Sequence, residues 1–253
     1  MDQSFNDSSV HPTRPGPLGQ HRTIHGRVVE LLGRRIVSGE FPDGSQLPNE
    51  TELAAQLEVS RGGIREAVKA LAAKGLVEPR PRLGTRVLPR RSWNLMDREV
   101  IGWHGESAAP GFLQDLLELR LMVEPNAARL AAERASHAEV TALEAAYAGM
   151  AEHAPRLPQA KVAFVQADLT FHLTLLRATD NQLIEQLGRL LETSLQHGLE
   201  ASSQAPGGVA ATLPLHHAVL IAVRAHRPVA AHRAMRRLIE TTSTAVERMI
   251  EPH

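Results

Sequence analysis

One carboxylate and two imidazoles are the residues of this chain whose types and spacing best suit chemistry. Asp168 and His172 lie four residues apart in an apolar stretch, so a helix would place them one turn from each other on one face. His216 lies on a later helical segment. Facing the core of a helical bundle, the three would suit Zn, Ni, Mn or Fe. The alternative is that Asp168 and His172 form only an ion pair on a helix surface.

A second candidate site consists of cationic residues in the N-terminal third of the chain. Arg61, Arg65 and Lys69 recur every four residues, so on a helix they form one exposed stripe. Ser60, which directly precedes them, is a good N-cap for such a helix. A cationic stripe at this place suits a helix in the DNA major groove, where Arg bonds phosphates or guanine edges. For any single arginine, the alternative is a solvated surface charge.

A short β hairpin is expected directly after this helix. Two β segments within residues 76–87 flank a turn that holds Arg80, Arg82 and Gly84. A basic hairpin tip of this kind can enter the minor groove or grip phosphate. We therefore predict DNA contacts from both the helix and the hairpin, and we include Ser60, and Thr51 of the preceding helix, among them.

The elements that position these residues are predicted from turn formers and apolar spacing. Residues 39–44 are dense in turn formers and end a preceding helix. The next helix opens at residues 47–50, where Pro and an acidic residue suit a helix start. Leu53 and Leu57 give that helix an apolar stripe. Two short helices joined by a tight turn and followed by a β wing form a winged helix-turn-helix, which we expect to span residues 21–91.

These segments together resemble the GntR family of bacterial repressors. The resemblance is nearly continuous from about Arg22 to Val87. It rests on Gly39 with residues 42–48, on Val59-Ser60-Arg61 followed by Ile64-Arg65-Glu66-Ala67, and on Gly75-Leu76-Val77. The resemblance implies that the predicted module binds DNA as part of a transcriptional regulator.

Length and composition limit what the rest of the chain can be. At 253 residues there is room for two domains. The chain has no cysteine, which excludes a disulfide framework, an iron–sulfur cluster and a thiol nucleophile. No apolar run approaches the ~20 residues of a membrane span, and the N-terminus is not signal-like, so we expect a soluble cytoplasmic protein. Residues 1–20 are rich in Pro and Gly and are expected to form a disordered tail.

The neutral net charge hides an asymmetry between the two parts of the chain. Residues 21–91 carry 13 Lys and Arg against 8 Asp and Glu, whereas residues 92–253 carry 14 against 18. A basic N-terminal part with an acidic C-terminal part fits DNA binding by the first domain only. Such binding should depend strongly on salt concentration.

The C-terminal part, residues 110–253, is expected to be a helical bundle. Breaks near Ser136, Pro155, Asp180, Gly207 and Pro228 divide it into roughly six helices of about 15 to 25 residues. Residues 92–109 are expected to form a linker helix, and both tryptophans of the chain fall there, with an expected role in packing domains or subunits together. The predicted fold is therefore mainly α, with an N-terminal winged helix-turn-helix and a C-terminal all-α bundle.

This C-terminal part resembles the helical effector domain of FadR-type regulators, called FCD. The resemblance rests on residues 118–120, 124–125 and 131–135, on residues 168–172, on Asn181, and on the segment from His216 to Val223. In that domain an Asp and three His commonly hold a metal under a carboxylate effector, and Asp168, His172 and His216 match three of these ligands. The fourth position, 22 residues beyond His216, is Leu238, which cannot bind a metal. Two outcomes stay open: a three-ligand metal, with Zn as first choice, or an effector pocket without metal.

A narrower resemblance, to the repressors of galactonate operons, rests on residues 93–97, 100, 103 and 194–196. It implies a sugar-acid effector such as D-galactonate, with a carboxylate and several hydroxyls. Arg120 would clamp the carboxylate, and Glu124 lies four residues later on the same helix face. Asn181 and Gln196 would bond hydroxyls. For each residue, the alternative is an inter-helix salt bridge, a cap or a surface bond.

The expected function is a repressor that binds a pseudo-palindromic operator as a homodimer and leaves it when a small carboxylate binds. Activation in place of repression stays open. So does an architectural DNA-binding dimer without an effector, which would have a fully apolar bundle interior. A metal-dependent hydrolase would use the Asp and His cluster to activate water. No nucleophile or general-base motif accompanies that cluster, so we expect no enzymatic activity.

Overall fold

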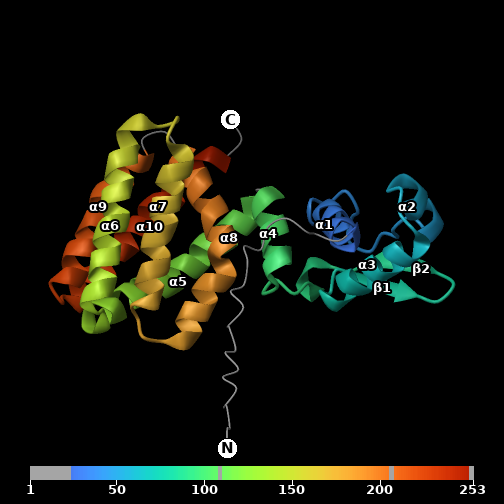
Figure 1. Ribbon diagram of the computed structural model, residues 1–253, viewed down its shortest axis with the longest axis horizontal. Helices are drawn as coiled ribbons and strands as arrows, with labels where there is room; N and C mark the ends of the chain where they lie inside the picture. The colour runs from blue at the N-terminus through green and yellow to red at the C-terminus, as the bar shows by residue number, and fades with distance from the viewer. Residues whose placement is uncertain (1–23, 108–109, 205–207, 251–253) are drawn as a thin grey trace, which may run out of the picture.

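The computed structural model describes residues 24–107, 110–204 and 208–250. A small module with a two-stranded sheet lies at one end of the molecule and a bundle of long helices at the other, with one short helix between them (Figure 1). The predicted fold class, a winged helix-turn-helix plus an all-α bundle, is confirmed. The tail expected over residues 1–20 lies outside the described residues.

The small module is built on three helices, two of which begin at well-formed side-chain caps. Asn49 caps α2 in a reciprocal capping box with Glu52, and Ser60 caps α3 by accepting a hydrogen bond from the Gly63 amide. Helix α3 packs against both α1 and α2, and Leu53 and Ile64 are buried in the core that the module shares. In chain order the module contains α1 (Ile24–Val37), α2 (Glu50–Gln56), α3 (Arg61–Ala73), β1 (Val77–Arg80) and β2 (Gly84–Val87).

The β wing is an antiparallel hairpin whose register pairs Val77 with Val87 and Arg80 with Gly84. Two residues at its tip have positive φ angles, 64° at Arg82 and 86° at Gly84. A glycine adopts such an angle without steric cost, which explains why Gly84 closes the turn. Residues 80–84 are all exposed, so the side chains at the tip of the wing point away from the core.

The linker between the two units is only partly helical. The helix expected over residues 92–109 begins at Arg98 instead: α4 covers Arg98–Ser107, after a short 3-10 turn, η1, at Arg90–Ser92. The reason is Asp97, whose carboxylate accepts hydrogen bonds from the amides of Glu99 and Val100 and so acts as the N-cap.

Both tryptophans are buried and pack α4 against the small module. Trp93 donates its indole N–H to the Leu88 carbonyl at 2.8 Å. The ring of Trp103 covers Gly33 of α1 so closely that a Cβ there would lie 2.4 Å from a ring carbon. Lys74, at the end of α3, bonds Asp97 and Glu99 at 2.7 and 2.8 Å, which adds an ionic connection to the same interface. The tryptophans thus contribute to packing within one chain.

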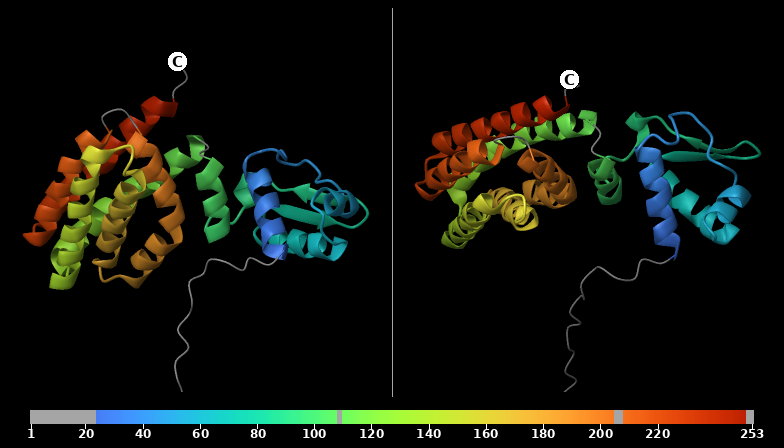
Figure 2. Two further views of the ribbon diagram at one scale, coloured as in Figure 1. Left: turned by 45° about the horizontal axis from the view of Figure 1, so that its top comes forward. Right: turned by 90° about the horizontal axis from the view of Figure 1, so that it is seen from above.

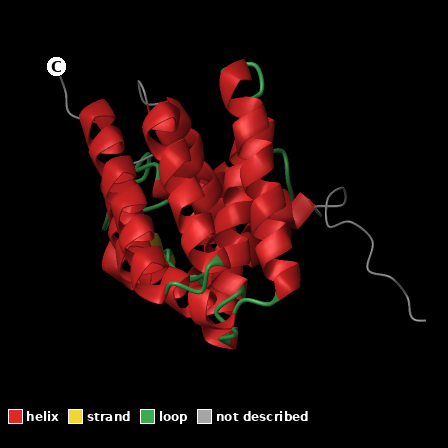
Figure 3. Cartoon of the chain, turned by 90° about the vertical axis from the view of Figure 1, so that its left-hand side faces the viewer, coloured by secondary structure: helices red, strands yellow, loops and turns green. Residues whose placement is uncertain are grey.

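The bundle consists of long helices whose breaks fall where the sequence predicts them. Helices α5 and α10 lie side by side along one side of the bundle (Figure 2). The axes of the bundle helices run roughly parallel to one another when the molecule is viewed from the bundle end (Figure 3). The interior is mainly Ala, Leu, Val and Phe. The helices are α5 (Pro110–Arg134), α6 (His137–His153), α7 (Lys161–Arg177), α8 (Gln182–Gln204), α9 (Gly208–Arg224) and α10 (Pro228–Ile250), with a 3-10 turn, η2, at Ala154–Arg156.

Among the described helices, none combines the length and the apolar character needed to cross a membrane.

Candidate functional site: a buried charged cluster and an exposed cationic face

Five polar side chains meet inside the bundle, and we call them the buried cluster: Arg120, Glu124, Asp168, His172 and His216. They come from α5, α7 and α9, and each residue is at most 5% exposed. The i, i+4 spacing on α5 and again on α7 turns both members of each pair toward the same interior point. Buried charges are rare unless they are paired or hold a metal, so this cluster is the main departure from an apolar bundle interior.

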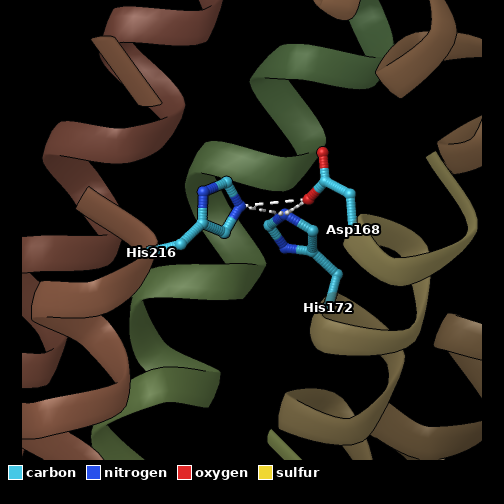
Figure 4. A group of neighbouring side chains, drawn as sticks. All are labelled: Asp168, His172 and His216. Carbon is cyan, nitrogen blue, oxygen red and sulfur yellow. Dashed lines mark hydrogen bonds and ion pairs between the residues drawn. The ribbon is translucent and has the colours of Figure 1, made fainter. Parts of the chain in front are cut away.

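Three atoms of the cluster converge in the arrangement of a metal site. The Oδ1 atom of Asp168 lies 3.0 Å from His216 Nε2 and 3.2 Å from His172 Nε2. The two Nε2 atoms are 3.4 Å apart. Figure 4 shows the two rings, carried by separate helices, facing the Asp168 carboxylate. Such a set of two imidazoles and one carboxylate matches the ligand preference of Zn, Mn, Ni or Fe.

The other ring nitrogen of each imidazole, Nδ1, also has a nearby partner. The Nδ1 atom of His216 lies 3.0 Å from the carbonyl oxygen of Thr212, one turn earlier on α9. The Nδ1 atom of His172 lies 2.6 Å from Glu124 Oε2 in an ion pair. A metal-binding histidine usually donates its other ring N–H to a carbonyl or carboxylate, which leaves the opposite nitrogen free for the metal. The donor set and its supports therefore fit a metal.

Arg120 and Leu238 set this cluster apart from a four-ligand metal site. Leu238 on α10, at the fourth position, is 1% exposed and offers no ligand atom. Arg120 donates from Nε to Glu124 Oε1 at 2.6 Å, and its Nη2 lies 3.2 Å from His172 Nε2. Its Nη1 is buried without a hydrogen-bond partner among the described residues. An unpaired guanidinium N–H in the interior is costly, so this atom is well placed to receive an anionic oxygen.

The cluster is held in a charged state by mutual compensation. Burial would raise the pKa of Glu124, but the charges of Arg120 and His172 outweigh it and lower that pKa to about 2. The pKa of Asp168 is likewise far below its usual range, because contacts with His216 and His172 outweigh burial. Burial would lower the pKa of His172, but the charge of Glu124 and contacts with both carboxylates raise it to about 9. A metal at this point would displace the proton of His172, because ligating imidazoles must be neutral.

Two of the residues expected to bind an effector are not in the buried cluster. Asn181 is the cap of α8, and its Oδ1 accepts from the amides of Leu183 and Ile184 at 3.0 and 3.3 Å. Gln196 is exposed on α8 and bonds Glu200, one turn along, at 3.1 Å. In this structure Asn181 therefore caps a helix and Gln196 makes a surface hydrogen bond, which are the alternatives stated for these two residues.

The second site is the exposed cationic face, which we define as the surface of Thr51, Ser60, Arg61, Arg65, Lys69, Arg80, Arg82 and Gly84. All of these residues are exposed. On α3 the three cations lie on the side opposite to Ile64, Val68 and Leu71, which are buried. The helix and wing residues of this set are thus all accessible to solvent.

Most side chains of the cationic face have partners within the module. Arg61 donates from Nη2 to the hydroxyl of Thr51, so that hydroxyl is already engaged. Arg65 binds the Glu50 carboxylate through two nitrogens, at 3.2 and 2.8 Å. Lys69 pairs with Glu66 on the same helix at 2.8 Å.

The wing shows the same pairing. Arg80 bonds Glu78, two residues earlier, at 2.7 Å. The Arg82 side chain has no recorded hydrogen bond or ion pair with any residue that the structure describes. It is therefore available to meet a partner outside the module.

Two supporting residues were missed by the sequence analysis. Glu50 was noted only as an acidic residue at a helix start, and its contact with Arg65 spans 15 residues of sequence. Thr212 supports His216 through its backbone carbonyl. A carbonyl is present in every residue, so the sequence carries no signal for the second contact.

Comparison with protein families finds two matching domains. The family described as bacterial regulatory proteins, gntR family, matches residues 24–87, and the FCD domain matches residues 115–241. These ranges cover the small module and most of the bundle. They agree with the resemblances found for the same segments.

Comparison with individual proteins points the same way. The galactonate operon transcriptional repressor of Escherichia coli K12 is 32% identical over 219 residues, which are 86% of this chain and 94% of that protein. The HTH-type transcriptional regulator YieP of the same strain is 31% identical over 91% of this chain and 98% of its own length. A solved structure of Lar, which controls expression of the Listeria monocytogenes agr system, shares the fold with a TM-score of 0.61 at 18% identity, over 92% of this chain and 100% of that one.

Proposed function

The chain belongs to the GntR family of bacterial regulatory proteins and carries an FCD domain, and we propose that it is a repressor released from its operator by a small carboxylate. Proteins of this family regulate transcription and are not enzymes, so the hydrolase alternative is set aside. The observation that carries the proposal is the pairing of an exposed cationic face in one domain with a buried cluster in the other.

The cationic face supports operator binding by the small module. Helix α3 presents Arg61, Arg65 and Lys69 on one exposed side, and the wing tip adds Arg82. We propose that α3 enters the major groove and that the wing contacts the backbone or the minor groove. A homodimer would place two such modules on the two half-sites of a pseudo-palindrome.

The buried cluster supports effector binding and suggests how it is coupled to DNA. Arg120 Nη1 has no hydrogen-bond partner among the residues that the structure describes and would bind one carboxylate oxygen of the effector. Because every residue of the cluster is at most 5% exposed, the effector reaches it only if the surrounding side chains or helices move. Effector binding would therefore favour one bundle arrangement over another, which is what coupling to a distant DNA site requires.

We propose a sugar acid as the effector class, and galactonate as the first compound to test. The support is the name of a relative, a galactonate operon repressor that is 32% identical to this chain. The Asp168, His172 and His216 group would hold a divalent metal whose charge assists in binding the carboxylate. An effector-independent architectural dimer is less well supported, because its bundle interior would be apolar.

The test starts from DNA sequences enriched from randomised duplexes by the full-length protein. The best duplex is then titrated by fluorescence anisotropy with and without D-galactonate, before and after chelation, while metal content is measured by plasma mass spectrometry. The proposal expects enrichment of a palindromic sequence and its release by a sugar acid. Binding that no carboxylate affects would favour the architectural alternative.

Replacement of Arg65 by Ala is expected to weaken binding to the enriched duplex more strongly than binding to unrelated DNA. A bidentate Arg contact with a base contributes about 1–3 kcal/mol of discrimination, and a dimer makes it in each half-site. The measurement is the ratio of the two dissociation constants at one salt concentration. Arg129→Ala, which removes an exposed arginine of the bundle, is the control and should leave the ratio unchanged.

Replacement of Gly62 or Gly63 by Ala should stabilise the small module and weaken DNA binding. Neither glycine has a positive φ, and an added Cβ would meet only Ser60 Oγ, at 3.8 and 3.5 Å. Ala is the better helix former by up to about 1 kcal/mol, so the fold itself does not require glycine here. We expect a higher melting temperature together with a roughly tenfold or greater loss of affinity for the enriched duplex, comparable to losing a base contact. Unchanged affinity would show that DNA does not approach this turn closely.

A further inference from the structure

Glu50 is an acidic side chain placed within the cationic face. It stands at the start of α2 and reaches across to α3, where both of its oxygens bind Arg65: Oε1 accepts from Nε at 3.2 Å and Oε2 accepts from Nη2 at 2.8 Å. The two side chains are 39% and 61% exposed, so the pair lies on the surface that would meet DNA. A carboxylate there repels phosphate, and its presence needs a reason.

Stability is a poor reason for this pair. Exposed ion pairs contribute little to folding, because water solvates both partners well. Glu50 suits the start of α2 through the helix dipole, but Glu52 places the same charge in that first turn. Glu50 is not needed as a cap either, since Asn49 and Glu52 already form a reciprocal capping box there.

The other acidic residues near the face differ from Glu50 in geometry. Glu66 pairs with Lys69 three residues along the same helix, and Glu78 pairs with Arg80 two residues along the same strand. Such local pairs leave the cation free to swing with its own element. Glu50 instead fixes Arg65 from a second helix and through two hydrogen bonds, which defines both the position and the plane of the guanidinium.

We propose that Glu50 is a positioning residue that sets base specificity by presenting Arg65 edge-on to DNA. With Nε and one N–H of Nη2 engaged by the carboxylate, the guanidinium keeps the outward N–H groups of Nη1 and Nη2. That remaining pair has the geometry for a bidentate contact with guanine O6 and N7. Without the carboxylate, Arg65 would be free to pair with the nearest phosphate, which carries no sequence information. This inference rests on the proposed function, since it concerns how the operator is read.

The test compares Glu50→Ala with Glu66→Ala, which removes the same charge from the same face. Each full-length variant is used to enrich sequences from randomised duplexes, and its affinity for the wild-type duplex and for unrelated DNA is measured over a range of salt concentrations. Glu50→Ala is expected to lose base preference at one position of each half-site, with a roughly ten- to hundredfold smaller ratio between the enriched and the unrelated duplex. Glu66→Ala is expected to bind all duplexes somewhat more tightly and to keep the wild-type preference.

The salt dependence separates positioning from simple charge removal. In Glu50→Ala the freed Arg65 should bind phosphate, so the dependence of log affinity on log salt for unrelated DNA should steepen by about one per module. Glu50→Gln keeps the size and one acceptor oxygen, and it should recover part of the base preference. It also carries the test if Glu50→Ala shows no cooperative thermal transition.

One outcome would contradict the role proposed for Glu50, and a different outcome would contradict the proposed operator binding. If Glu50→Ala and Glu50→Gln enrich the same sequences with wild-type selectivity, Glu50 does not position Arg65 for reading bases. If the wild-type protein itself enriches no sequence, the proposed operator binding fails, whatever the variants do.

Discussion

Replacement of Glu124 by Ala is expected to lower the free energy of unfolding of the bundle by about 3–5 kcal/mol, the usual cost of breaking a buried ion pair from one side. Glu124 is 2% exposed and contacts both Arg120 and His172. His172 can lose its proton once the carboxylate is gone, but Arg120 cannot. An uncompensated guanidinium would then remain in the interior, beside a cavity that the carboxylate used to fill.

The same helix supplies a matched control. Arg129 and Glu133 form an ion pair with the same i, i+4 spacing, at 2.7 Å, but their side chains are 41% and 39% exposed. Glu133→Ala should cost no more than about 0.5 kcal/mol, as exposed helix pairs do. The measurement is urea denaturation followed by circular dichroism, with both variants at pH 7. Equal losses in the two variants would contradict the view that the buried cluster is a tightly compensated unit.

The difference in stability between the wild type and Glu124→Ala depends on pH through the pKa of Glu124. Folding lowers that pKa from 4.5 to about 2, so the stability that Glu124 contributes is fully present above about pH 4.5. It is lost as the pH falls through about 2, where the carboxyl is protonated in both the folded and the unfolded chain. The wild type should therefore lose this contribution as the pH falls from about 4.5 to about 2, and its stability advantage over Glu124→Ala should narrow over that range. A gap that does not narrow between about pH 4.5 and 2 would contradict a lowered pKa of Glu124 in the folded chain.

Much of the fold follows from local sequence signals. Asn49, Ser60 and Ser136 cap their helices as side chains of their type do, and the breaks at Asp180 and Pro228 end helices where backbone preferences require it. The linker was the exception. A helix is expected over residues 92–109, but the Asp97 carboxylate caps the chain later, so the helix begins at Arg98.

The candidate sites were predictable only where a single helix carries the geometry. The four-residue spacing of Asp168 and His172, and that of Arg61, Arg65 and Lys69, is a local property of a helix. The contact of His172 with Glu124 joins residues 48 apart in sequence, and it depends on how α5 and α7 pack. Helix spacing also does not predict which way the Gln196 side chain points. It is expected to bond an effector hydroxyl, but it faces solvent.

Replacement of His216 by Ala is expected to abolish release by the effector while leaving operator binding intact. His216 supplies one of the three converging atoms, with Nε2 3.0 Å from Asp168 Oδ1. Loss of a hydrogen bond that merely supports a metal ligand costs about 10–100-fold in metal affinity, so loss of a ligand atom should cost more. The cationic face lies in the other domain and is untouched. The measurements are metal content after gel filtration and anisotropy of the enriched duplex as a sugar acid is added.

His217→Ala is the matched control, because the two histidines are neighbours with opposite surroundings. His217 is exposed and stacks on Tyr147 with ring centroids 5.0 Å apart, whereas His216 is 3% exposed within the cluster. His217→Ala should keep both the metal and the release. If His216→Ala loses the metal but still releases DNA on effector binding, Arg120 binds the carboxylate without help from a metal. If both variants release DNA like the wild type and hold as much metal, the buried cluster is not the effector site, and its charges serve only the packing of α5, α7 and α9.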